Sequence, residues 1–199
     1  GYSFYKSAAQ GRFTRLVFNN TPMDQPGRNI YIRDMDSGDY WTNAWQPVGK
    51  PLDQYKSICR HGTGYSIITS EYSNIQSETR YFVPLGKSHE CWQVKLTNIG
   101  NKKRRLRLFT YVEYTGHWNQ YNDFLNLQYS QYTVTMNVKN NIIDHGVNTY
   151  LPYVPEDFSV GDSCRHSFLG LIGATPSGYD TDKDIFIGTY NNYNNPAVV

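Results

Sequence analysis

Several features that define common protein classes are scarce in this sequence. Three cysteines among 199 residues are too few, and odd in number, for a disulfide framework, and no two have the close spacing of a zinc knuckle. Charged residues make up only 18% of the chain, and a net charge of +2 argues against a general polycation that binds nucleic acid. We therefore expect reduced thiols in a cytoplasmic protein that has no nucleic-acid partner.

Long apolar runs and helical periodicity are also missing. No stretch approaches the length of a membrane span, and residues 1–6 lack the shape of a signal peptide, so we expect no membrane partner. No segment keeps an amphipathic period over three helical turns. The five histidines have no second histidine or carboxylate at helical zinc spacing, which predicts that no metal is bound.

Aromatic residues and short alternating segments are abundant instead. Aromatic side chains make up 16% of the chain, with 18 tyrosines, a composition that suits β-sheets and also surfaces that stack on sugars. Alternation and turn residues predict strands in 13–18, 30–33, 65–72, 78–83, 132–138, 142–143, 168–172 and 185–190, with an ordered loop over 39–47. Many short strands at roughly ten-residue spacing favour an all-β sandwich.

The clearest alternation runs through residues 90–114. Apolar and polar residues alternate over 92–97, and from Phe109 onward both faces of the pattern become apolar or aromatic. Residues 100–101 interrupt the run. We predict a β-hairpin whose second arm enters the middle of two stacked sheets, with the basic residues 102–105 in a solvated turn.

A glycine-flanked segment, 59–65, contains the most specific pair of ligand candidates. Arg60 and His61 lie beside Gly62 and Gly64, which allow close approach of the backbone. The pair could recognise sugar hydroxyls or an anion. The alternative is a hairpin corner in which Arg60 pairs with a nearby acid.

Other candidates for sugar binding are aromatic and amide side chains. Trp41, Trp45 and Trp118 could stack on sugar rings, although burial is the commoner fate of tryptophan. Asn126 and Gln128 could hydrogen-bond sugar hydroxyls, although bonds to the loop backbone are the more frequent use of such amides. Carboxylates are catalytic candidates by residue type only.

Several segments together resemble a known family. They are Gly-Tyr-Ser-Phe-Tyr-Lys at 1–6, Trp45-Gln46-Pro47, Cys59-Arg60-His61-Gly62, Tyr81-Phe82-Val83-Pro84-Leu85 and the stretch 90–113. In this order they are similar to the N-terminal domain of glycoside hydrolase family 94, the cellobiose, chitobiose and cellodextrin phosphorylases. The resemblance implies a large antiparallel β super-sandwich of the galactose-mutarotase-like type. Residues 1–199 are then most of that domain, and a catalytic (α/α)6 barrel is absent from this chain.

The reaction that this resemblance implies is inverting phosphorolysis. An aspartate of the barrel protonates the glycosidic oxygen while inorganic phosphate, the co-substrate, attacks the anomeric carbon from the opposite face. The products are α-glucose 1-phosphate and a shortened chain, and no cofactor or metal takes part. We therefore expect no catalytic residue in this chain, which by itself is inactive, and a domain that supports a homodimer and borders the substrate channel.

Within the family, residues 126–129, 170–174 and 186–188 look most like cellodextrin phosphorylases. Residues 146–152 lack the Arg-rich segment of the enzymes that act on disaccharides. The resemblance thus implies a β-1,4-linked cello-oligosaccharide as substrate. The alternatives are a cellobiose-type phosphorylase, a free-standing carbohydrate-binding β-sandwich, and an aldose epimerase, which needs a histidine and a carboxylate in one pocket.

Overall fold

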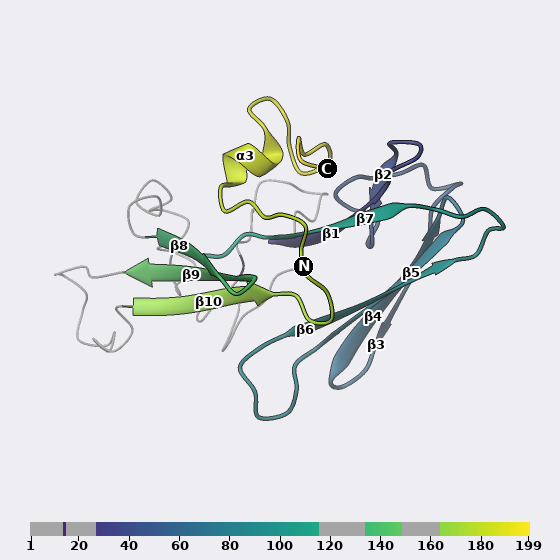
Figure 1. The fold of residues 1–199 in the computed structure, drawn as a ribbon. Coiled ribbons are helices and arrows are strands. Elements are labelled where there is room, and N and C mark those ends of the chain that lie inside the picture. Colours follow the sequence, from purple (N-terminus) through teal and green to yellow (C-terminus); the bar gives the residue numbers. More distant parts are fainter. Residues whose placement is uncertain (1–13, 15–26, 116–133, 149–163) are drawn as a thin grey trace.

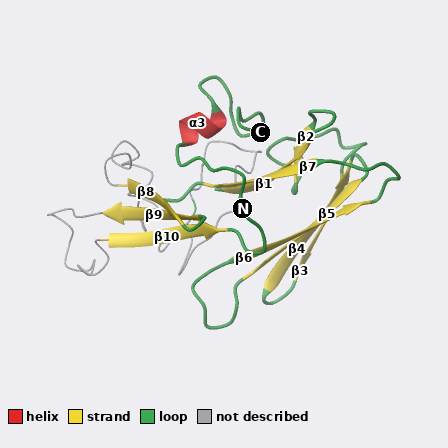
Figure 2. Cartoon of the chain, in the orientation of Figure 1, coloured by secondary structure: helices red, strands yellow, loops and turns green. Residues whose placement is uncertain are grey.

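The computed structural model describes residue 14 and residues 27–115, 134–148 and 164–199, and almost all regular structure in these ranges is β-strand (Figure 2). The strands are β1 (Arg28–Asp34), β2 (Tyr40–Thr42), β3 (Lys56–His61), β4 (Tyr65–Tyr72), β5 (Ile75–Phe82), β6 (Cys91–Asn98), β7 (Leu106–Val112), β8 (Val134–Lys139), β9 (Ile142–Asn148) and β10 (Cys164–Gly170). One short helix, α3 (Lys183–Ile187), follows them. The prediction of an all-β fold is confirmed. Within the described residues, no helix has the length and apolar character needed to cross a membrane.

The strands form three antiparallel sheets (Figure 1). Their strand orders are β2-β1-β7, β3-β4-β5-β6 and β10-β9-β8. In the four-stranded sheet and in the β8-β9-β10 sheet, strands that follow one another in the sequence pair with each other. By contrast, β1 pairs with β7, far along the chain. This long-range pair brings the start and the middle of the chain together.

Two-residue turns set the register of two hairpins. Ser73 and Asn74, between β4 and β5, have φ of 51° and 61°, and Asn140 and Asn141, between β8 and β9, have φ of 53° and 61°. Left-handed conformations at both central residues match the twist of the flanking strands, and asparagine tolerates them better than most residues. The turns predicted at these positions are confirmed.

The hairpin predicted over residues 90–114 is wrong. β6 pairs with β5, whereas β7 pairs with β1 in another sheet, so the two alternating arms do not bond to one another. The connection between them crosses from one sheet to the other. Arg104 in this connection donates to Asp34 Oδ2 at 2.7 Å and to the Ser73 carbonyl at 2.6 Å. This part of the basic run therefore fixes the connection between the two sheets and is not a solvated turn.

The β2-β1-β7 sheet packs one face on the four-stranded sheet. The cluster between them contains Ile32, Trp41, Tyr55 and Ile75, each at most 5% exposed. These residues come from both sheets and from the segment after β2. Because their apolar surface leaves water together, this cluster stabilises the stacking of the two layers.

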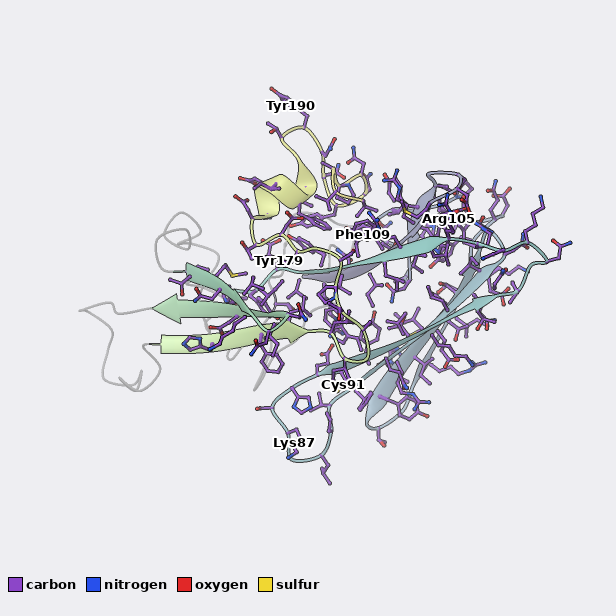
Figure 3. The ribbon with its side chains drawn as sticks, viewed as in Figure 1. Lys87, Cys91, Arg105, Phe109, Tyr179 and Tyr190 are labelled. Carbon is purple, nitrogen blue, oxygen red and sulfur yellow. The ribbon has the colours of Figure 1, made fainter. Side chains whose placement is uncertain are left out.

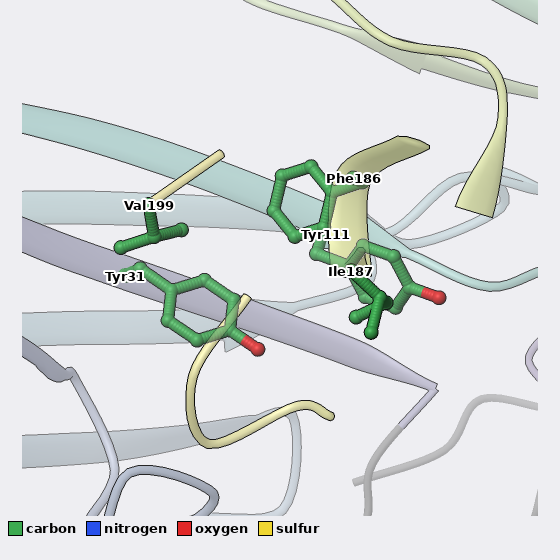
Figure 4. Packing of buried hydrophobic residues seen from close by; sticks show 5 residues of the cluster. All are labelled: Tyr31, Tyr111, Phe186, Ile187 and Val199. Carbon is green, nitrogen blue, oxygen red and sulfur yellow. The ribbon is translucent and has the colours of Figure 1, made fainter. Parts of the chain in front are cut away.

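The opposite face of the β2-β1-β7 sheet is covered by the last residues of the chain. Tyr31, Tyr111, Phe186, Ile187 and Val199 form a second buried cluster there, and Figure 4 shows these side chains converging from β1, β7, α3 and the C-terminal residue. Successive residues of a strand point to opposite faces. β1 is therefore buried on both sides, through Tyr31 on one and Ile32 on the other.

The strand predicted over 185–190 is wrong because this region forms α3 and a turn. Asp182 caps the helix by accepting a hydrogen bond from the Asp184 amide at 2.8 Å, and Gly188 ends it with φ of 90°. A helix of five residues is too short to display a helical period in its sequence. The loop predicted over 39–47 is also partly wrong, since it contains β2.

Candidate functional site

A large open concavity lies between β6, β7, the β8-β9-β10 sheet and the segment that leads into α3. Its volume is about 2550 Å³, and apolar residues of these strands form much of its lining. In Figure 3, Phe109 on β7, Cys91 on β6, Lys87 before β6 and Tyr179 mark the elements around it. An open concavity of this size, with polar clusters on its wall, has room for an extended ligand.

The first polar cluster on this wall surrounds Glu113, just after β7. Lys183 Nζ lies 3.1 Å from Glu113 Oε1, and Tyr111 donates its hydroxyl to Oε2 at 3.0 Å. The Tyr193 hydroxyl also donates to Oε2. The carboxylate therefore joins β7 to α3 and to the segment that follows it.

The pKa values around Glu113 are shifted by burial and by this negative charge. Burial, and then the Glu113 carboxylate, raise the pKa of both the Tyr111 and the Tyr193 hydroxyl. For Lys183, burial opposes the charged ammonium, but Glu113 and Tyr193 together outweigh it and the pKa is raised. The tyrosines thus stay neutral donors and the lysine stays charged. Glu113 accepts from all three partners, an arrangement that anchors α3 and the segment after it to β7.

A second polar cluster lies on the β8-β9-β10 sheet. His166 Nδ1 lies 3.0 Å from Asp144 Oδ1, and both side chains are exposed. Nearby, the Tyr114 ring packs on His145 with 5.0 Å between centroids, and its hydroxyl donates to the Phe168 carbonyl at 2.7 Å. Burial raises the pKa of Tyr114. His166 and Glu113 both line the concavity, where His166 contacts Asp144 and Glu113 contacts Lys183 and two tyrosines. The epimerase alternative, which needs a histidine and a carboxylate in one pocket, stays a prediction.

A third cluster, at the β6 side of the concavity, ties two sheets together. Arg28 of β1 forms an ion pair with Glu90, and its guanidinium lies 4.6 Å from the Tyr81 ring centroid and 5.6 Å from that of Trp92. Tyr81 accepts a hydrogen bond from Asn43 Nδ2 at 2.7 Å. Sequence reasoning missed this cluster because alternation assigns residues to a face and does not say which sheet lies opposite.

Arg60 and His61, two of the predicted sugar-binding residues, lie on β3 away from this concavity. Both are exposed and, as neighbours on a strand, point to opposite faces. The segment is indeed a hairpin corner, closed by the Gly62 amide donating to the Tyr65 carbonyl at 2.8 Å. In the described ranges no ion pair joins Arg60 to an acid. The role of Arg60 and His61 in ligand binding stays a prediction.

The remaining candidates divide into those the structure describes and those it does not. Trp118, Asn126 and Gln128 lie outside the described residues, so their roles stay predictions. Trp41 is 1% exposed and packs on Tyr72, which excludes it as a platform for sugars. Among the residues that the structure covers, no group of three or more histidine, cysteine, aspartate or glutamate side chains could hold a metal ion.

Comparison with protein families decides the assignment of the fold. The family model described as "Glycosyl hydrolase 94, supersandwich domain" matches residues 1–199. The chain belongs to glycosyl hydrolase family 94. The antiparallel sheets described above are those of its supersandwich domain, and the resemblance noted in the sequence is confirmed.

Curated relatives in glycosyl hydrolase family 94 are much longer than this chain. N,N'-diacetylchitobiose phosphorylase of Vibrio proteolyticus is 35% identical over the whole chain, and that of Vibrio furnissii is 34% identical, with 23% of each relative covered. Solabiose phosphorylase of Paenibacillus borealis is 29% identical over 86% of the chain and 21% of its own length. The chain thus corresponds to less than a quarter of these proteins.

Proposed function

We propose that this chain is the supersandwich domain of an inverting glycoside phosphorylase, which transfers a sugar from a β-linked saccharide to inorganic phosphate. The observation that carries the proposal is the match over all 199 residues to family members that are named phosphorylases. The chain covers 23% of those relatives, so most of such a protein, including a catalytic (α/α)6 barrel, lies outside residues 1–199.

The domain acts as a scaffold that borders the substrate channel. Its carboxylate on the wall of the concavity, Glu113, is held by a lysine and two tyrosines and serves as an anchor. The general acid and the phosphate ligands then belong to the barrel, where phosphate takes the place of the water that an inverting hydrolase activates. The open, mostly apolar wall of the concavity suits contact with further parts of the protein.

N,N'-diacetylchitobiose is the first candidate substrate. Two relatives named for it match the whole chain at 34–35% identity. Cello-oligosaccharides are the second candidate, favoured by the resemblance of residues 170–174 and 186–188 to cellodextrin phosphorylases. We further propose that the enzyme is a cytoplasmic homodimer and that it requires neither a metal nor an organic cofactor.

A substrate panel tests this proposal. The complete protein in which this chain occurs is incubated with inorganic phosphate and, in turn, N,N'-diacetylchitobiose, cellobiose and cellotetraose, and sugar 1-phosphate is measured with and without EDTA. We expect N-acetylglucosamine 1-phosphate from the first substrate, in an amount that depends on phosphate and is unchanged by EDTA. Glucose 1-phosphate from cellotetraose alone would support the second candidate. Equal sugar release without phosphate would overturn the phosphorylase assignment.

A further inference from the structure

Cys59 and His61 share one exposed face of β3. They are two residues apart in a strand, so their side chains point the same way, while Arg60 between them points to the opposite face. Both side chains are exposed, and β3 lies at an edge of the four-stranded sheet in the described structure. A reagent can therefore reach the thiol and the imidazole together.

The β3–β4 hairpin adds a third group to this pair. The bond from the Gly62 amide to the Tyr65 carbonyl closes the turn, and the register places Ser66 directly opposite His61. His61 Nδ1 lies 2.8 Å from Ser66 Oγ, and His61 Nε2 lies 3.3 Å from Cys59 Sγ. Each ring nitrogen of the imidazole thus has its own partner.

This arrangement has the parts of an activated nucleophile. When Nδ1–H donates to Ser66 Oγ, Nε2 carries the lone pair and faces the thiol of Cys59. A nucleophile, a base within hydrogen-bond reach and a group that orients the base define nucleophilic activation in unrelated enzymes. Cys91, the other cysteine that is free in the described residues, is partly buried and has no such histidine.

We propose that Cys59 is a reactive thiol, activated by His61, whose ring is oriented by Ser66. This thiol forms mixed disulfides with low-molecular-weight disulfides such as glutathione disulfide. His61 Nε2 accepts the thiol proton while Sγ attacks one sulfur of the disulfide. A new S–S bond forms as the old one breaks, and the leaving thiolate takes the proton from His61. Cys59 sulfur is oxidised, the departing sulfur is reduced, and no further reactant is required.

This site is independent of the phosphorylase proposal, because Arg60, Cys59 and His61 do not line the concavity. It makes the exposed edge of the four-stranded sheet a reversible modification site.

The test follows the mixed disulfide on individual peptides. The complete protein is exposed to glutathione disulfide at neutral pH, quenched over time, and the modified fraction of the Cys59 and Cys91 peptides is measured by mass spectrometry. We expect His61→Gln to slow modification of Cys59 by about tenfold or more, since a positioned base contributes at least this much. The rate at Cys91 serves as the internal reference and stays unchanged.

Two further variants separate activation from folding. We expect Ser66→Ala to slow modification of Cys59 by less than His61→Gln does. Ser66→Thr keeps the hydroxyl and is expected to keep the wild-type rate of modification. Thermal unfolding shows whether each variant is folded. A rate at Cys59 that is the same with and without His61 would overturn the proposal. So would failure of Cys59 to form the adduct in the folded protein.

Discussion

Arg28 on β1 and Glu90, immediately before β6, form an ion pair that joins two sheets of the domain. Trp92 donates its indole N–H to the same Glu90, and the Arg28 guanidinium lies over the Tyr81 ring. One carboxylate thus supports a contact between strands that are about sixty residues apart in sequence. Its removal leaves a half-buried guanidinium without this partner.

Replacing Glu90 by glutamine tests this contact. We expect Glu90→Gln to lower the local opening free energy of β1 and β6 by about 2 kcal/mol, the usual contribution of a hydrogen bond to a charged group. Hydrogen exchange of the complete protein, followed by mass spectrometry, measures this quantity for each strand. Asp36→Asn is the control: its pair with Arg105 is exposed and screened by solvent, so we expect a much smaller change than for Glu90→Gln. Equal effects of the two substitutions would contradict the assignment.

Asp34 predicts a dependence of stability on acid pH. The Asp36 amide, and then Arg104 and Ser37, hold its carboxylate and lower its pKa despite burial. A lowered pKa in the folded state adds stability above the ordinary carboxyl pKa of about 3.9, and that stability is lost as pH falls toward the folded value. We expect Asp34→Asn to lower the unfolding temperature at pH 7, and the difference from wild type to shrink below about pH 4. A difference that is constant with pH would show that charge has no part in it.

Tyr72 predicts that stability is lost as pH rises through the alkaline range, whereas Asp34 predicts a loss as pH falls. Burial, followed by its bond to Asp39 Oδ2 at 2.9 Å, raises the pKa of its hydroxyl to about 12. A raised pKa gives stability that is complete below the unfolded value of about 10 and is lost as pH rises through the folded value. The unfolding temperature of wild type therefore falls more steeply between about pH 10 and 12 than that of Tyr72→Phe. Tyr190→Phe, whose ring is 98% exposed, is the matched control and keeps the wild-type slope.

Substitution of Glu113 distinguishes a structural anchor from a catalytic acid. In Glu113→Gln the amide keeps an acceptor for Tyr111 and loses the charge that pairs with Lys183. We expect kcat of the complete enzyme to stay within about threefold of wild type, whereas loss of a general acid costs about a hundredfold or more. Hydrogen exchange at α3 is expected to increase. A hundredfold fall in kcat with unchanged protection of α3 would make Glu113 catalytic.

Local features of the fold could be predicted from the sequence, because each depends on neighbouring residues. Alternation located β4 and β8, and pairs of turn residues located the loops at 73–74 and 140–141. α3 was missed because a single turn held by the Asp182 cap has no period to detect.

Contacts between distant segments could not be predicted in the same way. The alternation in β6 and β7 fixes which side chains face inward, and both a hairpin and a crossing between sheets satisfy it. The polar clusters around Glu113 and Arg28 likewise depend on which strands meet. Four of the candidate binding residues lie within the described ranges: Trp41, Trp45, Arg60 and His61. Trp41 is buried in the core, and His61 forms part of the thiol cluster at β3.

The configuration of the sugar phosphate is the most direct test of inverting phosphorolysis. The complete protein is incubated with N,N'-diacetylchitobiose and phosphate, and the first product is followed by proton and phosphorus NMR before hydrolysis can alter it. We expect an α-configured sugar 1-phosphate that forms as inorganic phosphate is consumed. A β-configured phosphate, or free sugar released with no consumption of phosphate, would contradict it.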